Sequence, residues 1–115
     1  MIYVVFDTSF LINAVKAKVD FRKDIRMELG EFTPVLTSPV IRELNNLNKM
    51  EARVALELLK DHELFEAKGH ADTSVIVAAK EKDGYLATTD KEIRQRARAR
   101  EIKLITLREG KYLIF

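Results

Sequence analysis

The chain has 115 residues, of which 47% are hydrophobic and 33% charged, and its 20 basic and 18 acidic residues give a formal net charge of +2. This size predicts one domain over residues 1–115, with a core that needs no disulfide or structural metal. There is no cysteine, and apolar runs such as residues 2–6 fall far short of a membrane helix, which excludes thiol catalysis, cysteine-ligated zinc and a membrane protein. No signal-peptide pattern precedes that run, so we expect a cytoplasmic protein.

The order of apolar and polar segments predicts strands and helices that alternate along the chain. Residues 2–6 are apolar at every position, as in a strand covered on both faces, and residues 7–9 favour the start of a helix over 10–15. Ser38 is predicted to cap a helix that has Pro39 at its first position. This alternation is typical of an α/β fold with a central, mainly parallel sheet. The other helices are expected at 21–29, 38–48, 51–60, 71–82 and 89–100, and the other strands at 34–37, 64–67, 85–87 and 103–106, before a last apolar stretch at 112–114.

Four carboxylates are expected at the carboxyl edge of this sheet. Asp7 follows the first strand, Asp90 follows the strand over 85–87, and Asp72 and Glu43 stand in early turns of their helices. Ligands bind at this edge in such folds. Four acids gathered there would repel one another, and a bound divalent cation is the simplest remedy. We therefore expect the catalytic residues and the metal ligands to be the same four side chains, Asp7, Glu43, Asp72 and Asp90.

Each acid also has a structural interpretation when it is taken singly. Asp7 would fit as the cap of the helix that follows it, and the helix dipole favours Asp72 in a first turn. A capping box formed by Thr89 and Glu92 would leave Asp90 without a role. The phase of the helices, however, aligns these acids with apolar positions, so they are expected to be partly desolvated, which surface acids usually avoid.

The type of ligand favours Mg²⁺ or Mn²⁺. Oxygen donors without cysteine or a histidine pair suit these cations better than zinc. His62 and His70 are too few and too widely spaced for a zinc site, and we expect His62 at the surface and His70 in a loop. Carboxylate-held Mg²⁺ is typical of phosphoryl transfer and phosphodiester hydrolysis. The sequence has no phosphate-binding glycine loop, and Ser9 stands where a haloacid-dehalogenase-type phosphatase would need a second Asp.

The segment 91–103 is the most basic part of the chain. Arg94 and Arg98 form one pair at i,i+4, and Arg96 and Arg100 form another on the opposite rim of the same helix. A solvated helix surface is one interpretation. In the other, one of the two rims holds backbone phosphates of a nucleic acid beside the carboxylates, with an affinity that depends on salt. No run of exposed aromatic residues indicates base stacking.

Four segments carry a resemblance to a known family. IYVVFDTSFLIN, SPVIREL, HADTSVIVAAKEKD and YLATTDKEIRQRAR occur in this order, and the similarity that they carry covers essentially the whole chain. They resemble the PIN-domain ribonucleases, and the DTSFL start and the ATTDKEIRQRAR segment are most similar to archaeal VapC-like proteins and to related nucleases that process small-subunit ribosomal RNA. The resemblance implies a PIN-like, Rossmann-like three-layer α/β/α fold. It also implies an endoribonuclease that depends on Mg²⁺ or Mn²⁺ and leaves a 5′-phosphate and a 3′-hydroxyl.

The resemblance assigns roles to particular residues. It places the family's four acids on the four carboxylates named above, and it implies that the hydroxyls of Ser9 and Thr88 orient ligands or water behind them. Thr73 stands where some relatives carry a further Asp, so the implied site has four acids. The family also suggests a homodimer.

The sequence leaves two alternatives open. A PIN fold also serves as a non-catalytic RNA-binding or assembly module, although the four retained acids favour an enzyme. As an enzyme, the protein would be either a toxin with an antitoxin partner or a processing nuclease with a ribosome-assembly partner. RNA is the expected partner in every case, and no membrane partner is expected.

Overall fold

The computed structural model describes all residues 1–115. Strands and helices alternate along the chain, and none of the helices has the length and apolar content needed to cross a membrane. The elements are β1 (Tyr3–Phe6), α1 (Thr8–Lys16), α2 (Phe21–Leu29), β2 (Thr33–Thr37), α3 (Ser38–Asn46), α4 (Met50–Leu58), β3 (Glu63–Phe65), α5 (Ala71–Lys82), β4 (Tyr85–Ala87), α6 (Lys91–Ala99), β5 (Lys103–Arg108) and β6 (Tyr112–Ile114).

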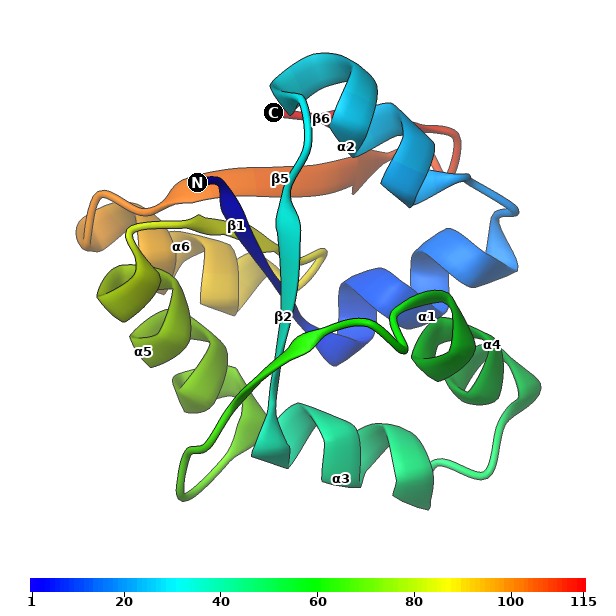
Figure 1. Cartoon of the computed structure of the whole chain (residues 1–115), viewed down its shortest axis with the longest axis horizontal. Helices are drawn as coiled ribbons and strands as arrows, with labels where there is room; N and C mark the ends of the chain where they lie inside the picture. Colours follow the sequence, from blue (N-terminus) through cyan, green and yellow to red (C-terminus); the bar gives the residue numbers. More distant parts are fainter.

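The six strands form one sheet in the order β3-β2-β1-β4-β5-β6. The first five strands are parallel, and only β6 is antiparallel, paired with β5. Figure 1 shows α5 and α6 together beside one part of the sheet and α1 and α4 together on its other side. The predicted three-layer α/β/α fold is therefore confirmed. Because the chain winds in opposite directions from β1 and from β4, the carboxyl ends of these two neighbours flank the crevice where such sheets bind ligands.

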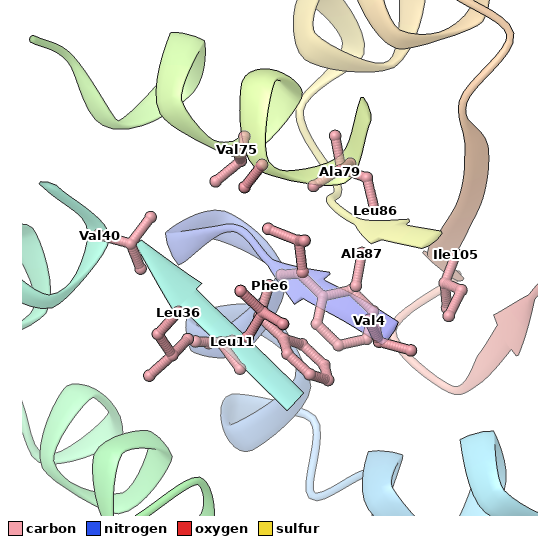
Figure 2. Close-up of a cluster of buried hydrophobic side chains, with 14 of the residues drawn as sticks. Val4, Phe6, Leu11, Leu36, Val40, Val75, Ala79, Leu86, Ala87 and Ile105 are labelled. Atoms are coloured by element: carbon pink, nitrogen blue, oxygen red, sulfur yellow. The ribbon is translucent and has the colours of Figure 1, made fainter. Parts of the chain in front are cut away.

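The core is one cluster of 25 buried apolar residues that fills the space on both faces of the sheet. Figure 2 shows Val75 and Ala79 of α5 on one side of the strands and Leu11 of α1 on the other. Phe6 of β1 anchors the second side, with its ring centroid 5.8 Å from that of Phe10. This packing fixes α1 and α5, the two helices that begin beside the carboxyl ends of β1 and β3.

The start of α3 differs by one residue from the prediction. Thr37, not Ser38, is the N-cap, and its Oγ1 accepts a hydrogen bond from the backbone N–H of Val40 at 3.3 Å. Ser38 lies inside the helix, where its Oγ donates to the carbonyl of Ala67 and accepts from the amide of Ala67, at 3.0 Å each. Two adjacent hydroxyl residues could cap this helix, and Thr37 does so because Ser38 is hydrogen-bonded to Ala67.

The predicted capping box of α6 is wrong. Asp90 is the N-cap, and its Oδ1 accepts from the N–H of Ile93 at 2.9 Å. The Oγ1 of Thr89 instead accepts from Nδ2 of Asn13 at 2.9 Å, a partner on α1. A hydrogen bond between residues distant in sequence therefore displaces the local capping pattern, and α6 begins at Lys91.

The remaining boundaries shift by a few residues. The fourth predicted helix ends at Leu58 instead of residue 60, and the strand expected at 64–67 occupies Glu63–Phe65. The strand expected at 103–106 continues to Arg108, because β6 folds back to pair with its last residues.

The turn between α5 and β4 brings two strands into close contact. Asp83 ends the helix with a left-handed φ of 51°. Gly84 then lies against β1, where a Cβ would stand 2.7 Å from the carbonyl oxygen of Tyr3. Only glycine therefore allows β1 and β4 to pair at this point.

Candidate active site

The carboxyl ends of β1 and β4 meet at the centre of the candidate site. The backbone N–H of Asp7, directly after β1, donates to the carbonyl of Ala87 at 2.9 Å. The N–H of Thr88, directly after β4, donates to Ile105 at 3.0 Å. The two chain segments that carry Asp7 and Asp90 are thus held side by side by the sheet itself.

A cavity of about 630 Å³ opens over these strand ends. Residues from the starts of α1, α5 and α6 and from α3 form its wall. All four predicted acids border it, and none of its lining residues is Lys or Arg. The lining residues are Asp7, Thr8, Ser9, Glu43, His70, Ala71, Asp72, Asp90 and Ile93.

Asp7 is the buried centre of the cavity wall. It occupies the N-cap position of α1, yet its side chain makes no capping hydrogen bond. Its Oδ2 instead accepts from Oγ of Ser9 at 2.7 Å and from Oγ1 of Thr88 at 2.8 Å. The residue is 4% exposed. The interpretation of Asp7 as a simple helix cap is therefore wrong, since its carboxylate is used by two hydroxyls from separate segments of the chain.

Each of these two hydroxyls also accepts a hydrogen bond from a backbone N–H. The Oγ of Ser9 accepts the backbone N–H of Thr89 at 3.3 Å, and Oγ1 of Thr88 accepts that of Asp90 at 3.1 Å. Because a hydroxyl has one hydrogen, each of them donates it to Asp7 and accepts the backbone N–H at a lone pair. This arrangement fixes the orientation of the Asp7 carboxylate and couples it to the backbone that carries Asp90.

Burial raises the pKa of the Asp7 carboxyl above its ordinary value. The hydrogen bonds from Ser9, Thr88 and the backbone of Thr8 act in the opposite direction, and the nearby negative charge of Glu43 raises the pKa further. Desolvation is the largest of these effects. The ionised form of Asp7 thus lacks a compensating positive charge in the protein.

Asp72 differs, because it already has a cationic partner. Its Oδ2 lies 3.5 Å from NH1 of Arg96 on α6, and its side chain is 47% exposed. The same guanidinium donates from NH2 to Oγ1 of Thr73 at 3.3 Å. This pair is not predictable from the sequence, because nothing local relates a residue of α5 to one of α6.

Two of the four acids are more exposed than expected. Glu43 and Asp90 are both exposed, so the prediction of partial desolvation is wrong for them. Asp90 precedes α6 as its N-cap and so does not lie on the helix face that packs on the sheet. Glu43 stands beside the buried Leu44 on α3, but on the side that turns toward the cavity.

The donor set fits a hard divalent cation. Carboxylate oxygens surround the cavity, and Asp7 presents a buried negative charge that the protein does not neutralise. No group of three or more His, Asp or Glu side chains stands close enough together to form a ready-made metal cluster. Bringing the four together therefore requires movement of side chains, for which the exposed Glu43 and Asp90 and the half-exposed Asp72 have room.

The histidines lie partly as expected. His70 precedes α5 in the loop, as predicted, and it also borders the cavity, a position that its neighbour Asp72 hinted at. His62 is half-buried rather than fully at the surface, and its Nδ1 lies 2.7 Å from the carbonyl of Leu59. Neither forms a histidine pair suited to zinc.

Comparison with known proteins agrees with this fold. The model of the PIN like domain family matches residues 4–110, and the chain belongs to this family. It is 31% identical to ribonuclease VapC4 of Methanocaldococcus jannaschii, over 97% of this chain and 95% of the relative. It is 35% identical to ribonuclease VapC9 of Archaeoglobus fulgidus, over 93% and 84%, respectively.

Solved structures are also similar. The PIN domain endonuclease Utp24 superposes with a TM-score of 0.81 at 26% identity, over 95% of this chain and 87% of the other. The VapBC2 structure from Rickettsia felis, bound to a DNA fragment from its promoter, gives a TM-score of 0.65 over 92% and 99%. At 14% identity, that second likeness concerns the fold alone. The membership of the PIN-domain ribonuclease family implied by the sequence motifs is thus confirmed.

Proposed function

We propose that this protein is an endoribonuclease that uses Mg²⁺ or Mn²⁺ held by Asp7, Glu43, Asp72 and Asp90. One observation carries the proposal: four carboxylates from four separate segments border one cavity that no Lys or Arg lines. A fold does not gather like charges without a use for them, because their mutual repulsion opposes folding. The names of the ribonuclease relatives support RNA as the substrate.

A cation of this kind, when bound, supplies a water nucleophile at neutral pH and offsets charge on the leaving oxygen of a phosphodiester. The residues of the chain prepare the site for it. Ser9 and Thr88 hold the carboxylate of Asp7 in one orientation, which avoids reorganisation during the reaction. Glu43 and Asp90 provide exposed carboxylates that can move, and Asp72 is held at the rim by Arg96.

The raised pKa of Asp7 makes cation binding depend on pH. A carboxylate must be ionised to bind a metal, so binding displaces any proton from Asp7. Affinity is therefore expected to increase as the pH rises through the pKa of this group. The buried charge that destabilises the free protein becomes the source of the binding energy.

The partners follow from the relatives. VapC ribonucleases are among the relatives, which favours the toxin alternative, in which a small antitoxin is the partner. The likeness to the endonuclease Utp24 supports the alternative role in RNA processing. A homodimer and a ribosome-assembly partner stay predictions from the sequence. A gene for a small protein directly beside this one, and growth arrest on expression, would favour the toxin.

Cleavage of a mixed pool of single-stranded and structured RNA tests the proposal. The wild-type protein would be incubated with Mn²⁺, with Mg²⁺ and with EDTA, beside Asp7→Asn and a matched control, Asp20→Asn. Asp20 is also an N-cap aspartate, but it is exposed and lies at the start of α2. Because Asn caps helices as well as Asp does, neither change should disturb the helix starts.

We expect cleavage that requires metal, that is retained in Asp20→Asn and that is lost in Asp7→Asn. The products should carry a 5′-phosphate and a 3′-hydroxyl. Cleavage that persists in EDTA or in Asp7→Asn would contradict the proposal. Metal-dependent RNA binding without any cleavage would instead favour the non-catalytic module.

A further inference from the structure

The basic helix α6 separates its four arginines between two cavities. Arg96 and Arg100 border a cavity of about 250 Å³ between α5 and α6. Arg94 and Arg98 border a different one, of about 220 Å³, between α6 and the strands β5 and β6. The residues that line the first cavity come from α5 and from α6 with its C-cap, so it is the groove between these two helices, which Figure 1 shows side by side. The two rims of one helix therefore face different surroundings.

The groove between α5 and α6 is linked to the acidic cavity through the side chain of Arg96. Arg96 reaches from this groove to Asp72, 3.5 Å away, and donates to Thr73 at 3.3 Å. Asp72 lines the acidic cavity and Thr73 lines the groove, so the two meet at adjacent residues. The side chains of Arg94 and Arg98 form no ion pair with a residue of the acidic cavity. An RNA strand that leaves the acidic cavity past Asp72 would thus enter the groove of Arg96 and Arg100.

The lining of the groove combines charge with an apolar floor. Ile76 and Val77 of α5 and Ala99 of α6 form the floor, and Val77 is 41% exposed. Arg96 of α6 and Arg100, the C-cap residue of α6, line the same groove and are four residues apart. Guanidinium groups bind phosphate through paired hydrogen bonds. The volume lies below the ~300 Å³ typical of complete small-molecule sites, so it suits part of a larger ligand, such as one nucleotide of a strand.

From this geometry we infer that the α5–α6 groove, defined as Thr73, Ile76, Val77, Arg96, Ala99 and Arg100, is a subsite for single-stranded RNA next to the acidic cavity. Arg96 and Arg100 bind backbone phosphate, and the apolar floor receives a base or sugar. The inference rests on the proposed function for the choice of RNA as ligand. It adds which rim of α6 the strand follows, and it leaves Arg94 and Arg98 outside the path.

In the protein without RNA, Arg96 is paired with Asp72, and it can exchange this partner for a phosphate. Its bond to Asp72 is long, and both side chains are partly exposed, so the pair contributes little to stability. Transfer of the guanidinium to a phosphate would release Asp72 to turn into the acidic cavity. Strand binding in the groove and assembly of the four carboxylates are thereby linked through one side chain.

The test compares two double variants that remove the same charge from the same helix. Binding of a fluorescent single-stranded RNA is measured by anisotropy for the wild type, Arg96→Gln/Arg100→Gln and Arg94→Gln/Arg98→Gln. All measurements are made in EDTA, so the result does not depend on catalysis. Thermal unfolding checks that each variant is folded.

We expect Arg96→Gln/Arg100→Gln to lower the affinity about 10-fold or more, equivalent to one charge-assisted hydrogen bond. The slope of log affinity against log salt should become shallower by about 0.7 for each backbone phosphate that the variant no longer binds. Arg94→Gln/Arg98→Gln should retain both the affinity and the slope within about twofold, because its rim faces away from the strand. Equal losses in both variants, a larger loss in the second, or no RNA binding by the wild type would each overturn the inference.

A second comparison tests the apolar floor without removing an arginine. Val77→Glu places a negative charge in the groove, and Met27→Glu places the same charge on the exposed face of α2, which Figure 1 shows on the other side of the molecule. Both residues are exposed, so both variants should fold. Val77→Glu is expected to weaken RNA binding at least fivefold more than Met27→Glu, and equal effects would contradict a subsite at this place.

These measurements separate the inference from the proposed function. Loss of binding confined to Arg96→Gln/Arg100→Gln, in a protein that cleaves no RNA with Mn²⁺, would support the groove and contradict the nuclease. Metal-dependent cleavage that the same variant leaves unchanged, together with unchanged binding, would support the nuclease and contradict the groove.

Discussion

The substitution Asp7→Asn should have opposite effects on stability with and without metal. The wild-type carboxylate is 4% exposed, and burial raises its pKa although two hydroxyls donate to it. Desolvation therefore destabilises the ionised carboxylate more than the hydrogen bonds stabilise it. Asparagine has nearly the same shape, retains a carbonyl oxygen that accepts from Ser9 and Thr88, and removes the charge.

In the absence of metal, Asp7→Asn is expected to raise the free energy of unfolding by about 1–2 kcal/mol, as when a destabilising functional group is replaced by a neutral one. For a chain of this size, 1 kcal/mol corresponds to about 4 °C in Tm. Asp7→Asn should therefore melt about 4–8 °C higher than the wild type in EDTA. The control Asp20→Asn, exposed and equally able to cap α2, should change Tm by less than about 2 °C.

The order should reverse with Mn²⁺. A ligand at 100 times its dissociation constant stabilises the folded state by about 2.7 kcal/mol. The wild type should gain this amount, and Asp7→Asn should gain much less because it lacks the buried ligand. Differential scanning fluorimetry in EDTA and in Mn²⁺ measures both differences. If Asp7→Asn is less stable than the wild type in EDTA, the carboxylate is a structural element and the argument from desolvation is refuted.

The same group gives a pH dependence with a defined sign. The pKa of Asp7 is raised in the folded protein above its ordinary value of 3.8. Well below pH 3.8 the group is protonated in both the folded and unfolded states, so no cost of ionisation arises there. As the pH rises from this value through the folded-state pKa, the buried group resists the ionisation that the unfolded chain undergoes freely, which favours unfolding. In EDTA, the stability of the wild type minus that of Asp7→Asn should therefore fall as the pH rises through this window, whereas a constant difference would contradict the assignment.

Three further substitutions test the scaffold of the site by chemical denaturation. Gly84→Ala should lower the free energy of unfolding by about 1–3 kcal/mol, because its Cβ would stand 2.7 Å from the backbone oxygen of Tyr3. An unchanged free energy of unfolding would mean that β1 and β4 separate easily. Thr88→Val should lose about 1–3 kcal/mol, since it removes a donor to Asp7 and leaves a backbone N–H unpaired, while Thr88→Ser should restore most of this loss. Phe6→Ala should lose about 3–5 kcal/mol from the aromatic cluster, and a loss below about 1 kcal/mol would contradict its tight packing.

Much of the fold was predictable because its signals are local. The uninterrupted apolar run of β1 and the matching bounds of α5 and β4 follow from the spacing of apolar residues. The antiparallel direction of β6 was not predictable, because it depends on a short turn that the apolar pattern does not define. The helix caps were mispredicted where a distant partner, such as Asn13 for Thr89, takes the side chain that the local pattern would use.

The candidate site divides in the same way. The topology brings the ends of the parallel strands to one edge, so the sequence predicts the four acids at that edge, and all four border one cavity there. The degree of burial of each acid was not predictable, since it depends on side chains from neighbouring elements. Asp7 is buried and accepts a hydrogen bond from Thr88, 81 positions away, whereas Asp90 is exposed. The pairing of Asp72 with Arg96 joins two helices and has no signature in the sequence.

The most direct test of the four-carboxylate site is a single-turnover cleavage assay against Mn²⁺ concentration. The variants Asp7→Asn, Glu43→Gln, Asp72→Asn and Asp90→Asn would each be compared with the wild type and with Asp20→Asn. The proposed site predicts that every one of the four loses cleavage or needs far more Mn²⁺, while Asp20→Asn follows the wild-type curve. Wild-type cleavage that is independent of Mn²⁺, or four variants that all follow the wild-type curve, would contradict it.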